Sequence, residues 1–202
     1  MRILVIQESN WIERGPHQSH HLMERMAQRG HEIHVIDFDI LWRQKANKKI
    51  LSPRFVFFAP PKVIPGAEIM VIRPSIIQLP VFEYLSLLYS HRRELIRQFD
   101  EFKPDVVVGF GILNARIAIS LCRKQKTPFV YYIIDELHHL VPQPYFQTIA
   151  KTIEQKNFRS ADLVLSINEG LREYTIQMGA PRERTGVIRA GVDLAFLDVL
   201  TG

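Results

Sequence analysis

The chain has 202 residues, 47% of them hydrophobic, and its 26 Lys and Arg residues exceed its 21 Asp and Glu residues by five. This length supplies one sizeable hydrophobic core, and no apolar run reaches the ~18 residues that span a bilayer. Charged Glu8 follows the first apolar residues too soon for a secretory signal peptide, so we expect a cytoplasmic protein. The single cysteine, Cys122, excludes an internal disulfide and lies on an apolar helical stripe, which indicates a buried, inert thiol.

Short apolar strands alternate with helix-period segments along the chain. The predicted strands are Arg2–Gln7, Glu32–Ile36, Ile69–Arg73, Asp105–Phe110, Phe129–Ile134, Leu163–Ile167 and Thr185–Arg189. The predicted helices are Ser19–Arg29, which Gly30 ends as a left-handed cap, Phe82–Phe102, Leu113–Lys124, Tyr145–Arg159 and Gly170–Met178. This alternation predicts an α/β fold, a doubly wound parallel sheet with helices on both faces.

Residues 40–67 are the least regular part of the chain and the most basic. No acid stands between Asp39 and Glu68, and two interpretations stay open. Either the segment is a solvated loop that flanks a core strand at Phe55–Phe58, or its cations and aromatic rings form a patch that contacts the inner face of the membrane. No nucleic-acid-binding motif accompanies the charge. The cations are Arg43, Lys45, Lys48, Lys49, Arg54 and Lys62, and the aromatic residues are Trp42, Phe55, Phe57 and Phe58.

The carboxyl ends of parallel strands collect ligands, so the loops that follow the strands are the candidate site. The first loop, Gln7–His17, enters a helix whose free N–H groups can hold an anion. Either Arg14 with Gly15 approaches that anion, or the loop is a flexible surface turn. His17 has metal-ligand spacing to His20 or His21, but no zinc motif accompanies it, and we predict no metal site.

Ionisable groups are densest after the strand Phe129–Ile134. The carboxylates Asp135 and Glu136 stand there with His138 and His139, and Asn168 follows the next strand. Asp135 and Glu136 can either act on a ligand or cap the turn before the next helix. Asn168 is either a helix N-cap or a polar wall of the site.

Four segments of the chain resemble the N-terminal domain of GT-B glycosyltransferases of the family-4 type. They are Gly30-His31, Pro104-Asp105, Arg159–Ser166 and Gly186–Phe196. The resemblance implies a Rossmann-like domain over residues 1–190, the start of an interdomain linker at 191–202, and a missing second domain that binds the donor. The chain departs from the family pattern where Glu13 and Arg14 replace paired glycines, Phe110 replaces a histidine, and Ile134 replaces the histidine of a His-Asp pair whose aspartate Asp135 matches.

The resemblance implies the acceptor-binding half of a retaining, metal-independent glycosyltransferase that takes a nucleotide sugar as co-substrate and is inactive alone. Its acceptor would be a glycan or a lipid-linked molecule. The resemblance assigns catalysis to Asp135 and Glu136, because a carboxylate in an apolar cleft can orient a sugar hydroxyl or take its proton. From the loops that follow the strands we place Gly15, His17, Phe110, His138 and Asn168 at the substrate and Arg14 at the donor phosphate. We expect Gly15, His17, Phe110, Asp135, Glu136 and Asn168 to lie within one surface depression at the carboxyl ends of the strands.

Two alternatives stay open beside the glycosyltransferase hypothesis. The departures from the family pattern also suit a non-catalytic or split-enzyme subunit that docks a separate donor-binding protein or a membrane assembly. A nucleotide-binding sensor or an epimerase relative would share only the fold.

Overall fold

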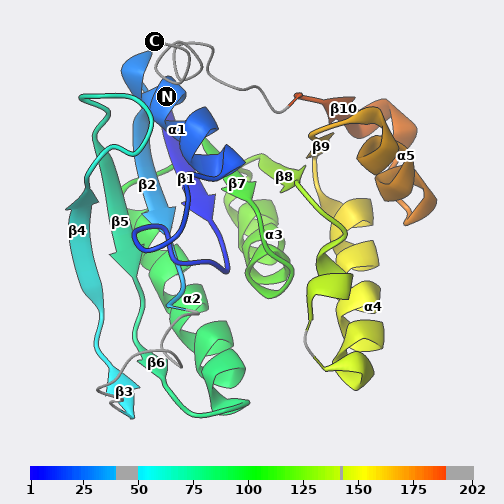
Figure 1. Cartoon of the computed structure of the whole chain (residues 1–202), viewed down its shortest axis with the longest axis horizontal. Coiled ribbons are helices and arrows are strands. Elements are labelled where there is room, and N and C mark those ends of the chain that lie inside the picture. The colour runs from blue at the N-terminus through cyan, green and yellow to red at the C-terminus, as the bar shows by residue number, and fades with distance from the viewer. Residues whose placement is uncertain (40–49, 142, 190–202) are drawn as a thin grey trace, which may run out of the picture.

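The structure is a computed structural model that describes residues 1–39, 50–141 and 143–189 (Figure 1). Within these residues an eight-stranded sheet has the order β10-β9-β8-β7-β1-β2-β5-β4, and β3 pairs with β6 in a separate ribbon. The strands are β1 (Arg2–Ile6), β2 (Glu32–Ile36), β3 (Leu51–Ser52), β4 (Phe55–Ala59), β5 (Ile69–Arg73), β6 (Ile76–Ile77), β7 (Val106–Gly109), β8 (Phe129–Ile133), β9 (Leu163–Ser166) and β10 (Thr185–Val187).

The predicted alternation of strands and helices is confirmed, with boundaries that shift by one or two residues. Gly30 follows α1 with φ +83°, in the left-handed conformation predicted for a cap. The helices are α1 (Gln18–Gln28), α2 (Phe82–Glu101), α3 (Leu113–Gln125), α4 (Pro144–Ser160) and α5 (Glu169–Gln177), with short 3-10 turns η2 (Leu137–Leu140) and η3 (Arg182–Arg184).

The strand order reverses direction at β1, which pairs with β2 on one side and with β7 on the other. As a result α1 packs on one face of the sheet, where Met23 joins the core around Val5 and Val35. The other helices pack on the opposite face, where Leu95 and Phe158 join the core around Leu4. Helices therefore cover both faces, as the doubly wound topology predicts.

The edge strand β4 differs from the sequence prediction in two ways. It runs antiparallel to β5, and its Phe55 and Phe58 side chains are 50% and 69% exposed although Phe55–Phe58 was predicted as a core strand. An edge strand pairs with one neighbour only, and of this strand only Ala59 is buried.

Cys122 is 1% exposed, and burial raises the pKa of its thiol to about 12, which confirms the buried, inert thiol. Among the described helices none combines the length and the apolar character needed to cross a membrane.

Candidate active site at the carboxyl ends of the strands

The strand order reverses between β1 and β7, which is the position where ligands bind in sheets of this topology, and we call this position the crevice. Half-buried Glu8, from the loop after β1, reaches across this crevice to the start of α3, and its Oε1 accepts a hydrogen bond from the backbone N–H of Asn114 at 2.8 Å. Burial raises the pKa of the Glu8 carboxyl, while backbone N–H groups of Ile112, Leu113 and Asn114 pull it in the opposite direction.

Asn114 brings a second polar group to the same crevice. Its side chain is fully buried, and neither amide atom has a hydrogen-bond partner among the described residues. Gly111 closes the arrangement, because a Cβ atom there would lie 2.6 Å from Asn114 Oδ1 and 2.7 Å from Glu8 Oε1. Glu8 and Asn114 therefore meet next to Gly111. The sequence analysis did not select either, since only the strand order places their loops together.

A buried ion pair beneath the β1–α1 loop joins three neighbouring strand ends. Arg73 Nε donates to Asp37 Oδ1 at 2.9 Å, and Arg73 Nη2 donates to Asp37 Oδ2 at 2.6 Å and to Asn10 Oδ1 at 2.9 Å. Asn10 Nδ2 donates to Asp39 Oδ1 at 3.1 Å, and the Trp11 N–H donates to Asp37 Oδ2 at 3.0 Å. These bonds hold the first part of the loop in one conformation.

His20 holds the second part of the loop. Its Nε2 lies 2.9 Å from the Trp11 carbonyl oxygen and its Nδ1 lies 3.1 Å from the His17 backbone nitrogen. A carbonyl needs a donor and an N–H needs an acceptor, so the neutral Nε2–H tautomer satisfies both bonds. Burial lowers the pKa of His20 to about 4, in agreement with a neutral ring. Gly15 lies against this ring, since an added Cβ would be 2.8 Å from His20 Cε1.

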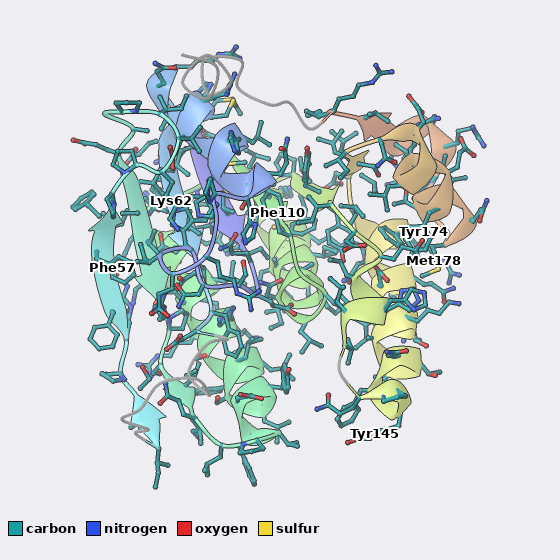
Figure 2. The ribbon with its side chains drawn as sticks, in the orientation of Figure 1. Phe57, Lys62, Phe110, Tyr145, Tyr174 and Met178 are labelled. Atoms are coloured by element: carbon teal, nitrogen blue, oxygen red, sulfur yellow. The ribbon has the colours of Figure 1, made fainter. Side chains whose placement is uncertain are left out.

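Lys62 ties the loop to the segment that follows β4 (Figure 2). Its ammonium donates to the carbonyl oxygens of Ile12, at 2.7 Å, and of Arg14. The backbone N–H of Lys62, with those of Val63 and Ile64, donates to the Glu24 carboxylate of α1 at 2.7–2.9 Å. Lys62 therefore has internal partners, whereas the sequence predicted it as one of the cations of a basic surface.

The exposed part of the loop consists of Glu13, Arg14, Gly15, Pro16 and His17. Burial together with the neighbouring charges of Arg14 and Lys62 lowers the pKa of His17. Both ring nitrogens of His20 are used within the loop, and no group of three or more His, Cys, Asp or Glu side chains suited to a metal was found in the described residues.

Phe110 lies at the centre of the carboxyl edge but inside the core (Figure 2). Its side chain is 8% exposed, and its ring centroid lies 5.3 Å from that of Tyr132. The Tyr132 hydroxyl donates to the Ile188 carbonyl oxygen at 3.1 Å, and Gln18 Nε2 of α1 donates to that hydroxyl at 3.4 Å. Phe110 therefore supports the floor of the candidate site.

The loop after β8 presents the two predicted catalytic carboxylates. Asp135 is exposed, and its Oδ1 accepts a hydrogen bond from the Glu136 N–H at 2.8 Å, so Asp135 caps the turn with one oxygen. Glu136 is partly exposed and lies 3.3 Å from His139 Nε2. Both carboxylates are accessible from solvent, and their catalytic role stays a prediction.

His138 points into the protein, where it meets two side chains from α4 and α5. Its ring is 4% exposed, and its Nδ1 lies 2.8 Å from Glu154 Oε2 and 3.0 Å from the Tyr174 hydroxyl. Burial lowers the pKa of His138 and raises that of Glu154 to about 7, so the neutral forms of both are favoured. His138 was predicted to contact the substrate, but its observed partners are Glu154 and Tyr174 inside the protein.

Asn168 caps α5, because its Oδ1 accepts the Leu171 N–H at 2.8 Å. The predicted residues from four loops thus share one edge of the sheet, but Phe110 and His138 are buried beneath it. A surface pocket of about 370 Å³ lies elsewhere, next to the start of β5, and is lined by Phe58, Ala59, Pro61, Gly66, Ala67 and Glu68.

Of the predicted basic patch, Arg43, Lys45, Lys48 and Lys49 lie outside the described residues. Arg54 forms a two-point ion pair with buried Glu94 of α2, with nitrogen–oxygen distances of 2.7 and 2.9 Å. Arg54 and Lys62 are therefore both engaged within the protein.

The comparisons with known proteins agree with this architecture. The sheet has the topology of half of a GT-B enzyme, and the family model for glycosyltransferase family 4 matches residues 18–196. The chain therefore belongs to glycosyltransferase family 4. No curated protein matches it.

Solved structures show the same fold at low identity. The chain is 16% identical to the Anabaena HepE protein, solved in complex with UDP and glucose, with a TM-score of 0.59 over 96% of this chain and 46% of that one. It is 11% identical to sucrose-phosphate synthase from Thermosynechococcus elongatus, with a TM-score of 0.62 over 96% and 49% of the two chains. The UDP-N-acetylglucosamine 2-epimerase from Rickettsia bellii is 14% identical, with a TM-score of 0.53 over 100% and 47%. The chain spans about half the length of each.

Proposed function

We propose that this chain is the acceptor-binding half of a retaining glycosyltransferase that uses a nucleotide sugar as donor. The observation that carries the proposal is the glycosyltransferase family match over residues 18–196, together with a span of 46% of HepE, which was solved with UDP and glucose. In this proposal a second, donor-binding half faces the carboxyl edge of the sheet. Asp135 and Glu136 act from that edge.

The crevice between β1 and β7 suits an uncharged hydroxyl better than a phosphate. A helix N-terminus attracts anions, but the Glu8 carboxylate already accepts the Asn114 N–H at the start of α3 and would repel a phosphate. Half-buried Glu8 can accept a hydrogen bond from a hydroxyl, whereas the Asn114 side chain is fully buried. We assign Glu8 to an acceptor hydroxyl, and Arg14 to the donor phosphate.

The reaction forms a bond between an acceptor oxygen and the anomeric carbon of the donor sugar. The bond from that carbon to the donor phosphate breaks, and the nucleoside diphosphate leaves with the bonding electron pair. Exposed Asp135 is the carboxylate we assign to orient the acceptor hydroxyl and to take its proton. The configuration of the sugar is retained.

The test supplies this chain with a donor-binding half, in trans or as the continuation of the gene product, and offers a panel of nucleotide sugars. We expect nucleoside diphosphate release and glycosylated acceptor, with an unchanged anomeric configuration by NMR, only when both halves are present. Transfer that survives Asp135→Asn unchanged would remove the role of Asp135. Absence of transfer across the panel, with a second half shown to bind the donor, would overturn the proposal.

Glu8→Gln separates the acceptor role of Glu8 from a structural one. We expect a higher KM for the acceptor and an unchanged KM for the donor, while Glu32→Gln, an exposed carboxylate at the opposite strand end, should leave both unchanged. Epimerisation of UDP-N-acetylglucosamine without any acceptor would instead favour the epimerase alternative.

A further inference from the structure

Helix α2 has an apolar outer face in addition to the face that it buries. The buried face includes Leu87, Leu95 and Phe99. The side chains on the opposite side are spaced at 82, 85, 89 and 96, which places them on one stripe of a helix with 3.6 residues per turn. These are Phe82, Leu85, Tyr89 and Ile96, with exposed fractions of 55%, 59%, 72% and 38%.

Arginine is the only charged residue exposed on this face between positions 82 and 96. Arg92 and Arg93 are exposed beside Tyr89, while the two acids in this stretch, Glu83 and Glu94, are buried on the inner face. A surface helix of a monomeric protein normally turns mixed charges to water. Between positions 82 and 96 the outer face of α2 instead combines large apolar side chains with positive charge, and exposed acids follow only at Asp100 and Glu101 in its last turn.

The β3–β6 ribbon extends the apolar face at the start of α2. Leu51 of β3 pairs with Ile77 of β6, and the Ile77 N–H donates to Ser86 Oγ of α2 at 3.0 Å. Leu51 is 61% exposed and Ile77 36%. Figure 1 shows the ribbon near the start of α2, at the carboxyl edge of the sheet. The α2 surface consists of Leu51, Ile77, Phe82, Leu85, Tyr89, Arg92, Arg93 and Ile96.

We propose that the α2 surface binds an anionic lipid bilayer, with α2 lying in the plane of the interface. Apolar and aromatic side chains insert among the acyl chains of such a surface, and arginines meet the phosphates of the head groups. The net charge of the chain, +5, favours the same partner. This location is separate from the patch predicted at residues 40–67, of which Arg54 and Lys62 are engaged internally and the other cations lie outside the described residues.

The inference does not depend on glycosyl transfer, but it bears on the acceptor. Because α2 begins at the carboxyl edge of the sheet, a bilayer in contact with its first turns lies on the side of the candidate active site. A lipid-linked acceptor would meet the domain there. Failure of the lipid assay would leave the proposed transferase activity intact, and failure of the transfer assay would leave lipid binding intact.

The test is co-sedimentation of the protein with vesicles of phosphatidylcholine alone or mixed with phosphatidylglycerol. We expect binding to the mixed vesicles that weakens as salt rises, because the charge contribution is screened. Leu85→Glu with Tyr89→Glu should abolish binding at every salt concentration. Arg92→Gln with Arg93→Gln should weaken it about thirtyfold at low salt, at roughly 1 kcal/mol for each of the two cations.

The matched control is the exposed apolar pair on α4, Tyr145 and Ile149, which are 69% and 56% exposed (Figure 2). Tyr145→Glu with Ile149→Glu should leave vesicle binding unchanged, and circular dichroism should show that all variants fold. Equal loss in the control pair, or equal binding to neutral vesicles, would overturn the proposal. It would also be overturned if the α2 variants abolished self-association in sedimentation velocity while vesicle binding persisted, since α2 would then join two copies.

Discussion

Arg73 and Asp37 form a two-point ion pair beneath the loop that leads into α1, with nitrogen–oxygen distances of 2.9 and 2.6 Å. The pair joins the ends of β5 and β2, and through Asn10 it reaches the loop that follows β1. Both partners are buried, so neither can exchange its hydrogen bonds for water. The exposed loop residues Arg14 and His17 therefore extend from a fixed base.

Arg73→Met should destabilise the protein by about 3–5 kcal/mol, because it leaves the Asp37 carboxylate buried without its partner. Urea unfolding measures this change. The double variant with Asp37→Leu should lose less stability than the two single variants lose in sum, and the difference is the coupling free energy between the residues. Arg182→Met removes the exposed pair with Glu173 and should cost less than about 1 kcal/mol. Equal costs for the two arginine substitutions would contradict a special role of the buried pair.

Gly111→Ala should cost about 1–3 kcal/mol, because the new methyl group would meet Asn114 and Glu8 at less than 3 Å. The matched substitution is Gly170→Ala in the first turn of α5, where the nearest atom would lie at 3.3 Å. There the greater helix propensity of alanine offsets the closer contact, and stability should not fall. Thermal unfolding of both variants checks the difference, and similar melting temperatures would show that the crevice tolerates displacement of Glu8.

His20 should make the protein sensitive to acid. The pKa of His20 falls from an ordinary 6.5 to about 4, so the unfolded chain takes up a proton that the folded protein excludes. Stability is then lost as pH falls from 6.5 towards 4, by at most about 3 kcal/mol. NMR titration of the His20 ring and urea unfolding between pH 6.5 and pH 4 test whether stability falls with pH. A His20 pKa above 6 would refute it.

Glu154 should make the protein lose stability as the pH rises, which is opposite to the effect of His20. Its pKa rises from an ordinary 4.5 to about 7, so the folded protein holds a proton that the unfolded chain releases. The contribution is present below pH 4.5 and is lost as pH rises to about 7, at a cost of at most about 3 kcal/mol. Glu154→Gln, which resembles the protonated acid, should be more stable than the unaltered protein at pH 8 and similar to it at pH 4. A lower stability of the variant at pH 8 would contradict the protonated state.

Local sequence was enough to predict most elements of the sheet. Val106–Gly109 is a short run of apolar residues bounded by Lys103-Pro104, and such a run forms a strand that is buried on both faces. The edge strand at Phe55–Ala59 was misjudged, because its aromatic residues are typical of a core strand. Only the sheet order shows that, among the described residues, this strand lies at the edge with Phe55 and Phe58 exposed.

The candidate site was predicted less well than the fold. The loops after the strands were identified correctly as one edge of the sheet, since parallel strands bring their carboxyl ends together. No local pattern predicts the pairing of Glu8 with Asn114, or of Arg73 with Asp37, because 106 and 36 positions separate the partners.

The sequence by itself determined the alternation of strands and helices, the cap at Gly30 and the family, because these depend on hydrophobic period, on backbone freedom and on short motifs. Only the tertiary structure decided which polar side chains are buried and paired. Phe110 and His138 turned inward, and Arg54 and Lys62 found internal partners, because burial and pairing depend on neighbours that are distant along the chain. The exposed apolar face of α2 also follows only from the tertiary structure. The helix has apolar residues on two faces, and its packing shows which face is buried in the core.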